Sequence, residues 1–326
     1  MKIGFDLMGS DKAPQNELEA LKLLNEDAPY DLLVIGKGDY EADVIDCGFK
    51  FQLADEVVGM HEIPAVAVRQ KKNSSLAILI DLLKKKEIDA VVSAGNTGAI
   101  LGFSMIELGK IEGLSRAGLA ITFPTESGYA VIIDIGANIH PKAIDYVNYG
   151  LMGSVFSEIV LKKNKPRVAM LNIGRESAKG DEIRQKAYQM LKEANLNFIG
   201  NIEGNDIMKG FADVIVSDGF TGNVILKFTE GMVESIWLML KATVDAARRK
   251  AMRKKLGQFL VKPAIKNLKA RFNYEEYGGG MLLGVEGVVI VCHGRSSPRA
   301  LKNAIKLAKI CVEFNIVEEI RKRVKP

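Results

Sequence analysis

Short apolar runs alternate with helix-like patterns along almost the whole chain, and this alternation constrains the fold more than any other feature. The runs are 2–6, 31–35, 89–93, 129–134, 167–173, 213–217 and 287–292. None alternates apolar and polar residues as a half-buried strand does, which favours strands covered on both faces. Stretches with a period near 3.6 residues, such as 75–85 and 181–193, lie between most of them. The sequence therefore predicts a doubly wound α/β fold (α/β/α) with a mostly parallel sheet.

The length of the chain is compatible with more than one arrangement of such a fold. The chain has 326 residues, and single hydrophobic cores stop growing near ~250–300 residues, so one unit and two lobes both fit. No repeat and no low-complexity linker divides the sequence. We therefore expect a single α/β unit over 1–326, from which a basic segment at 229–277 projects as helices.

The few cysteines and histidines argue against metal and disulfide frameworks. The three cysteines form no C-x-x-C pair, and the three histidines lack metal-ligand spacing. We expect no metal, no cofactor and a reducing compartment. The N-terminus has no apolar signal-like segment, and no window approaches the ~20 apolar residues of a membrane span. The prediction is a cytoplasmic protein.

Five of the apolar runs lead into glycine-rich turns. These turns are 6–11, 93–98, 134–138, 172–174 and 217–223. The carboxyl ends of parallel strands lie along one edge, where open α/β folds bind ligands, so we expect the five loops to converge. Glycine admits close approach of main-chain N–H groups, and helix N-termini add unpaired donors. The combination indicates a site for an anion such as phosphate.

Each loop alone is also what an ordinary strand-to-helix turn requires, so the functional interpretation depends on the side-chain donors that the loops carry. They are Ser93, Asn96, Thr97, Thr221 and Asn223. The glycine pair at 36–38 lacks the third glycine of a dinucleotide fingerprint, and neither a P-loop nor a G-x-S-x-G motif occurs. Lys179, in the loop 174–180, is a further candidate, and a solvated loop lysine is its alternative interpretation.

Basic residues are concentrated in one segment. From Lys241 to Arg271 there are eleven basic residues against one acid, a net charge of +10, whereas the rest of the chain carries −5. Apolar residues recur there at three- and four-residue steps, which predicts a basic amphipathic helix interrupted at Pro263. Such a helix fits its own protein, a sister subunit or a membrane surface. The candidate membrane or partner contacts are Leu256, Phe259, Leu260, Lys262, Ile265, Lys266 and Leu268.

The ordered set of motifs resembles the phosphate acyltransferases of the PlsX type, which act at the start of bacterial phospholipid synthesis. The matching segments are 6–14, 93–99, 134–138, 171–174, 179–180, 200–204, 218–223, 277–279, 282–284 and 293–294. Each segment is weak evidence by itself, whereas their order over nearly the whole chain is specific. Lys12 stands where the family usually has His, which leaves the role of Lys12 open, and Gly280 stands where it usually has Ala.

The resemblance implies a fold similar to isocitrate and isopropylmalate dehydrogenases and to phosphotransacetylase, in a homodimer without a metal. It implies transfer of a fatty acyl group from acyl carrier protein to inorganic phosphate, with a membrane glycerol-3-phosphate acyltransferase as a downstream partner. From the resemblance and loop position, we expect catalytic roles for Lys179, Asn223 and Asn96. The residues expected to bind phosphate or substrate are Asp6, Gly9, Ser93, Gly95, Thr97, Gly98, Asn138, Asn172, Gly219, Thr221 and Gly222.

The chemistry implied by the resemblance agrees with the residues present. Phosphate is itself the nucleophile, so no Ser–His or Cys–His pair is needed, and none was found. Two other classes stay open: a phosphotransacetylase-like enzyme that uses a small CoA thioester, and a nucleic-acid binder that uses the +10 segment. The glycine-rich loops favour an enzyme over the binder. The apolar stripe of the basic helix favours peripheral attachment to an anionic membrane over docking of the carrier protein.

Overall fold

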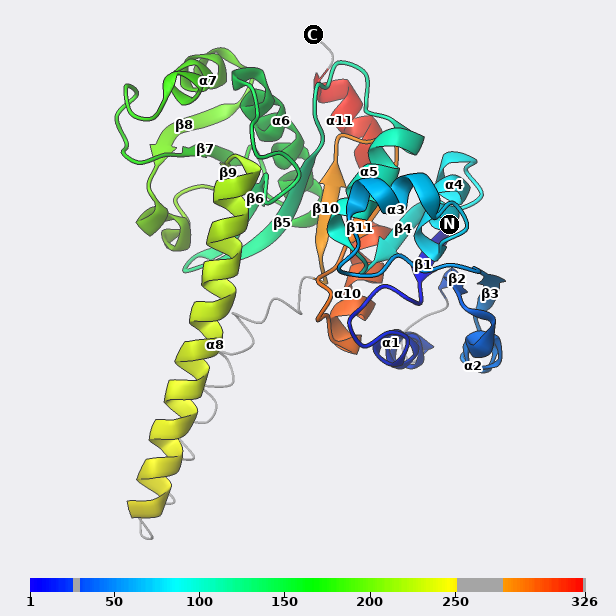
Figure 1. Ribbon diagram of the computed structural model, residues 1–326. Helices are drawn as coiled ribbons and strands as arrows, with labels where there is room; N and C mark the ends of the chain where they lie inside the picture. The colour runs from blue at the N-terminus through cyan, green and yellow to red at the C-terminus, as the bar shows by residue number, and fades with distance from the viewer. Residues whose placement is uncertain (26–29, 251–277, 325–326) are drawn as a thin grey trace.

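The computed structural model describes residues 1–25, 30–250 and 278–324, and one eleven-stranded sheet runs through this part of the chain (Figure 1). The strands are β1 (Lys2–Asp6), β2 (Asp31–Gly36), β3 (Lys50–Leu53), β4 (Ala90–Ser93), β5 (Gly118–Thr125), β6 (Gly128–Ile133), β7 (Arg167–Leu171), β8 (Asn197–Ile202), β9 (Val214–Val216), β10 (Gly280–Leu283) and β11 (Val288–Val291). Their order in the sheet is β3-β2-β1-β4-β11-β10-β5-β6-β9-β7-β8. All seven predicted runs form strands.

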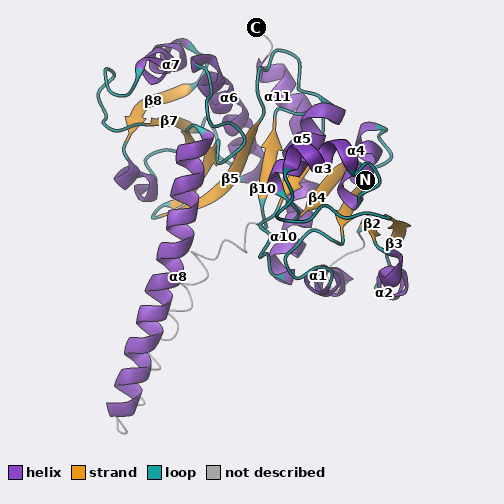
Figure 2. Cartoon of the chain, viewed as in Figure 1, coloured by secondary structure: helices purple, strands orange, loops and turns teal. Residues whose placement is uncertain are grey.

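Helices cover both faces of this sheet, which confirms the predicted α/β class (Figure 2). They are α1 (Gln15–Asn25), α2 (Glu41–Asp46), α3 (Pro64–Gln70), α4 (Ser75–Lys84), α5 (Thr97–Phe103), α6 (Ala143–Val160), α7 (Glu182–Glu193), α8 (Gly219–Lys250), α10 (Pro298–Glu313) and α11 (Ile316–Val324), with the short 3₁₀ helices η1 (Gly38–Tyr40) and η3 (Gly204–Lys209) and the short π-helix η2 (Ser104–Leu108). In β2, Leu32 and Val34 enter the core that contains α1 and α10. Leu33 and Ile35 enter the core that contains α4 and α5. Two buried faces explain why the runs lack in/out alternation.

The strands form two parallel blocks that run in opposite directions. β1, β2, β3, β4 and β11 are mutually parallel, as are β6, β7, β8 and β9. Between the blocks, the pairs β11–β10, β10–β5 and β5–β6 are all antiparallel. Three reversals leave the second block opposed to the first. The prediction that all five glycine-rich loops converge on one edge is therefore wrong, and the loops form two sets.

The two blocks lie in two lobes, and α8 starts in one of them and projects away from the body (Figure 1). One lobe holds β5 to β9 with α6 and α7, and the other holds β1 to β4 with α1 to α5. The outer part of α8, 229–250, falls within the segment 229–277 that was predicted to project. The candidate membrane contacts from Leu256 to Leu268 lie outside the described residues.

Candidate active site

The first set of loops follows three neighbouring parallel strands, β1, β4 and β11. Asp6 ends β1 and is buried, and Ser93 at the end of β4 donates a hydrogen bond from Oγ to Asp6 Oδ2 (2.7 Å). Ser93 Oγ also accepts from the main-chain N–H of Gly95 (3.0 Å). Burial raises the pKa of Asp6, and the hydrogen bond from Ser93 opposes that rise. The pair links two of the predicted loops from within.

Gly9 and Gly95 allow these two loops to touch. A Cβ on Gly9 would lie 2.8 Å from the main-chain nitrogen of Gly95, closer than real Cβ atoms approach. Gly98 packs against Pro64 in the same way, because a Cβ there would lie 2.5 Å from the proline Cγ. These glycines serve loop-to-loop packing, whereas Thr97 between them is exposed to solvent.

Asn96 was predicted to orient phosphate or a carbonyl oxygen, but its side chain is already occupied. Its Oδ1 accepts from the N–H of Ala99, which caps α5. Its Nδ2 donates to the main-chain oxygens of Gly59, Met60 and Glu62 at 3.0–3.3 Å. A phosphate contact would replace these bonds. The structure therefore gives Asn96 the role of anchoring the loop that follows β3.

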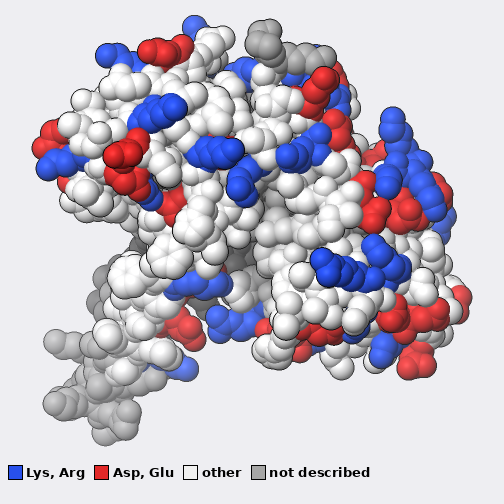
Figure 3. Space-filling view, turned by 45° about the horizontal axis from the view of Figure 1, so that its top comes forward, with Lys and Arg blue, Asp and Glu red and all other residues white. Residues whose placement is uncertain are grey.

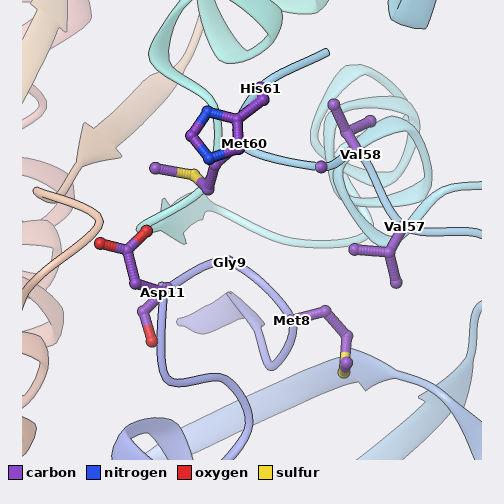
Figure 4. Close-up of a pocket in the computed structure, with 9 residues that line it drawn as sticks. Met8, Gly9, Asp11, Val57, Val58, Met60 and His61 are labelled. Atoms are coloured by element: carbon purple, nitrogen blue, oxygen red, sulfur yellow. The ribbon is translucent and has the colours of Figure 1, made fainter.

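The loop held by Asn96 forms one wall of a cavity of about 480 Å³. Figure 4 shows this wall facing the loop after β1. The cavity is lined by Met8, Gly9, Ser10, Asp11, Val57, Val58, Gly59, Met60 and His61. Its volume lies in the range of small-molecule sites, and its lining combines apolar walls with a few polar groups, as such sites do.

Glu17 of α1 holds the loop after β1, which forms the other wall of the cavity. This carboxyl is fully buried, and its Oε1 accepts from the N–H of Ser10 (2.9 Å). Its Oε2 has no hydrogen-bond partner among the described residues. Burial raises the pKa of Glu17 to about 7. A carboxyl with a raised folded-state pKa binds its proton more tightly in the folded protein, so stability falls as the pH rises from about 4.5 to about 7.

Glu17→Gln is expected to remove this loss. Above pH 7 the variant should be more stable than the unchanged protein by about 1–3 kcal/mol, and the difference should vanish towards pH 4.5. Urea unfolding at several pH values measures it. Glu19→Gln, on an exposed position of the same helix, is the control. Equal stability of Glu17→Gln and the unchanged protein at pH 8 would contradict the expectation.

The second set of loops follows β6, β7 and β9, which are also neighbours. Asp134, directly after β6, is buried and organises this set. Its carboxylate accepts from the main-chain N–H groups of Leu119, Gly136, Ala137 and Asn138 at 2.6–3.1 Å. Burial raises the pKa of Asp134, and these four donors oppose the rise. Asp134 belongs to the glycine-rich motif 134–138, but it was not among the site residues predicted from the sequence.

Asn138 is held in the same network. Its Nδ2 donates to the main-chain oxygen of Ala117 (2.5 Å) and to the hydroxyl of Tyr149 (3.0 Å), and its Oδ1 accepts from Arg116 (3.2 Å). The predicted substrate contact is therefore engaged within the protein.

The N-terminus of α8 packs directly onto the loop after β6. A Cβ on Gly222 would lie 2.0 Å from the main-chain oxygen of Asp134, and one on Gly219 would lie 2.7 Å from that of Asn138. Asp218 accepts from the N–H (2.8 Å) and from the hydroxyl (2.8 Å) of Thr221. Only glycine permits this approach. Asp218 caps the helix, and the hydroxyl of the predicted donor Thr221 is already bonded to this cap.

Lys179 and Asn223 differ from the other predicted polar site residues on these loops. Both are exposed, and neither side chain has a hydrogen-bond or ion-pair partner among the described residues. The Lys179 stem lies over Gly174, with Cγ 2.9 Å from where a Cβ would stand. The Cβ and Cγ of Asn223 each lie 4.0 Å from the position that a Cβ on Gly136 would take. Two donors thus remain available on adjacent loops, after β7 and β9.

An ion pair joins the elements that carry these two residues. Arg184 of α7 contacts Asp218, which precedes α8, and also contacts Asp181. Asn172, at the end of β7, donates from Nδ2 to the main-chain oxygen of Lys179 (3.1 Å). The side chain of Asn172, predicted to bind phosphate or substrate, is therefore bonded to the loop of Lys179.

Helix α8 connects the two sets of loops. From Asn223 the helix runs one turn, about 6 Å, to Lys227, whose Nζ lies 2.8 Å from Nε2 of His293 in the loop after β11. Gly294 in turn packs beside Met60 and Asp11 of the cavity wall. Figure 3 shows a hollow between the two lobes, with Lys and Arg side chains on its sides. The first turns of α8 therefore link the second set of loops, at Asn223, to the first set, at His293.

Within the described ranges, no group of three or more His, Cys, Asp or Glu side chains lies where it could hold a metal ion. Cys47, Cys292 and Cys311 are buried, and burial raises the pKa of all three thiols. None of these thiols suits a nucleophile.

Comparison with known proteins decides the family. A sequence model described as "Fatty acid synthesis protein" matches residues 1–319. A phosphate acyltransferase of Heliobacterium modesticaldum is 41% identical, over 99% of this chain and 98% of that protein. The chain belongs to the phosphate acyltransferase family. It is accordingly an enzyme of the acyltransferase class.

Other phosphate acyltransferases agree with this assignment, and one solved structure shares the fold. Phosphate acyltransferases of Desulfitobacterium hafniense and Dictyoglomus thermophilum are 40% and 41% identical, and the matches cover 97% and 96% of those proteins. A phosphotransacetylase from Streptococcus pyogenes superposes with a TM-score of 0.66 at 15% identity, covering 96% of this chain and 94% of that one. This structural similarity shows a shared fold for this phosphate acyltransferase.

Proposed function

We propose that this protein transfers a fatty acyl group from acyl carrier protein to inorganic phosphate. A phosphate oxygen attacks the thioester carbonyl carbon, the C–O bond forms and the C–S bond breaks. The carrier thiolate leaves and takes up a proton, and acyl phosphate is released. Two kinds of group must assist: donors that hold phosphate beside the carbonyl, and charge that stabilises the oxyanion.

The observation that carries this proposal is the free pair Lys179 and Asn223. Every other predicted asparagine on the loops is used within the protein, whereas these two are exposed on neighbouring loops. A lysine cation suits the developing oxyanion, and an amide suits phosphate or the carbonyl oxygen. Glycines at 219 and 222 let the first turn of α8, which carries Asn223, pack closely onto the loop after β6.

The test is phosphate-dependent loss of thioester from long-chain acyl carrier protein, followed by detection of acyl phosphate. The same assay with acetyl-CoA examines the phosphotransacetylase-like alternative. Turnover of carrier-bound substrate well above that of the CoA thioester supports the proposal. Turnover of the CoA thioester alone would replace it with the alternative.

We further propose that the protein acts as a homodimer. Val224, Phe228 and Met232 recur at four-residue steps on α8 and are exposed, Phe228 by 68%. A row of exposed large apolar side chains on one helix indicates an interface. We propose that 1–326 is one catalytic unit, and that α8 and the segment 229–277 supply its accessory contacts.

The basic segment is proposed to hold the enzyme at an anionic membrane from the cytoplasm. No helix in the described part of the chain is long and apolar enough to cross a membrane. Five apolar residues between Leu256 and Leu268 would insert, and Lys262 and Lys266 would meet anionic headgroups. Acyl phosphate would then be released near a membrane glycerol-3-phosphate acyltransferase. We propose no nucleic-acid partner.

Leu260→Glu combined with Ile265→Glu is expected to release the protein from anionic vesicles while acyl transfer to phosphate in solution stays within about twofold. Burial of apolar area contributes about 25 cal/mol per Å², and two added charges also meet repulsion from anionic lipid. Vesicle sedimentation and light scattering measure binding and oligomeric state. Continued sedimentation, or joint loss of dimer and activity, would show that this segment serves assembly instead.

A further inference from the structure

The loop that carries Lys179 is held by side-chain amides from three separate elements. They belong to Asn172 at the end of β7, Gln185 on α7 and Asn201 on β8. The bonds are Asn172 Nδ2 to Lys179 O (3.1 Å), Gln185 Nε2 to Ala178 O (2.9 Å) and to Gly180 O (3.1 Å), and Asn201 Nδ2 to Glu176 O (2.9 Å). The main-chain oxygens of Lys179 and of both its neighbours are therefore fixed from outside the loop.

An ion pair fixes the beginning of the same loop. Arg175 donates from Nη2 and Nε to the two carboxylate oxygens of Asp206 on η3, at 2.7 and 3.1 Å. The Asp206 side chain is buried, and Arg175 lowers the pKa of Asp206 to about 2. Because a bidentate pair sets orientation as well as distance, the loop enters the site in one direction.

Asn201 is kept at a position where it is unfavourable for stability. Asn201 is 6% exposed and precedes the buried Ile202 on β8. Its Nδ2 is bonded, but its Oδ1 is buried with no hydrogen-bond partner among the described residues. A half-satisfied buried amide costs folding free energy, so an apolar residue would suit the strand better. What the asparagine provides is the bond to the loop, which also accounts for part of the motif at 200–204.

We infer that Asn201 and Gln185 are positioning residues that hold Lys179 at the reacting thioester. This inference rests on the proposed role of Lys179. Neither residue touches substrate in this account. They act by keeping the loop in one conformation, so that the Lys179 ammonium does not have to be ordered in each turnover.

Asn201→Leu tests this with two readouts that should move apart. We expect kcat to fall about 10-fold or more, since small misplacements of a reacting group have large effects on rate. We expect the melting temperature to stay the same or rise, since the unpartnered oxygen is gone. Asn197→Leu is the control, because Asn197 lies on the same strand, is exposed, and donates to the main-chain oxygen of Lys165 (3.0 Å), away from the Lys179 loop. Unchanged kcat in Asn201→Leu would overturn the inference.

Gln185→Ala provides a variant that cannot fail through misfolding, because Gln185 is exposed on α7. Gln189→Ala, one turn further along and also exposed, is its control. We expect a lower kcat only for Gln185→Ala, and faster tryptic cleavage after Lys179. In a protein that already carries Lys179→Ala, Gln185→Ala and Asn201→Leu should lower kcat no further.

The double-mutant result distinguishes the positioning role of Asn201 and Gln185 from the proposed function itself. If Lys179→Ala strongly lowers turnover but the second substitutions still reduce it by their full factor, the inference fails and the proposed function stands. If Lys179→Ala alone is fully active, the role of Lys179 in the proposed function fails, and the inference fails with it.

Discussion

Replacing Lys179 by Ala is expected to lower kcat about 10²–10³-fold, the usual effect of removing one group that stabilises a developing oxyanion. The melting temperature should barely change, because the exposed ammonium of Lys179 makes no ion pair or hydrogen bond among the described residues. Phosphate-dependent release of thiol from long-chain acyl carrier protein measures kcat, and thermal unfolding measures stability. A change in rate without a change in stability places Lys179 at the reaction.

Lys186→Ala is the matched control for this substitution. Lys186 is an exposed lysine on α7, a short distance along the chain from the loop. The substitution Lys186→Ala removes the same charge and should leave kcat unaltered. Equal activity in a folded Lys179→Ala variant would remove Lys179 from the mechanism.

Gly222→Ala is expected to abolish activity and to destabilise the N-terminus of α8. The added Cβ would lie 2.0 Å from the main-chain oxygen of Asp134 and 3.1 Å from Cα of Ile135. Both are backbone atoms of a buried loop, so no side chain can swing aside, and the helix itself must shift. Its N–H groups and Asn223 would move with it. Activity assays at rising phosphate concentration should show no recovery.

Gly231→Ala tests the same chemical change further along the same helix. A Cβ at Gly231 meets nothing within 4 Å. Removing a helix-interior glycine should raise stability by up to about 1 kcal/mol, with activity retained. If both variants stay active, the contact between α8 and the loop after β6 has no role in catalysis.

Pattern reasoning found seven strands and missed β3, β5, β8 and β10, although β10 is fully buried. β3 and β8 are the outermost strands, and their polar residues break the apolar runs. β5 contains Pro124, which argues against a strand. Missing β5 and β10 had the largest consequence, because the antiparallel pairs that these two strands form reverse the second block. Strand direction depends on pairing between distant segments, which periodicity does not report.

For the site, sequence reasoning located the loops but not the division of labour among their residues. It selected Asn96, Asn138 and Asn172 together with Asn223 because all four follow strands. In the structure the first three are satisfied by main-chain and side-chain partners, and Asn223 is not. Which amide is free depends on loop geometry several residues away. The buried carboxylate of Asp134 was within reach of the sequence, since an acid at a strand end before glycine is a common anchor for such a loop.

The unbroken sheet has a consequence for how substrate can enter. Because β10 is hydrogen-bonded to β11 on one side and to β5 on the other, the lobes share one backbone ladder. Rigid-body separation of the lobes would break the hydrogen bonds of β10 and β11 at the centre of the sheet, where both strands are fully buried. If the substrate is the proposed acyl carrier protein thioester, we expect its entry to depend on the reach of its pantetheine arm and on side chains at the rim more than on a hinge between the lobes.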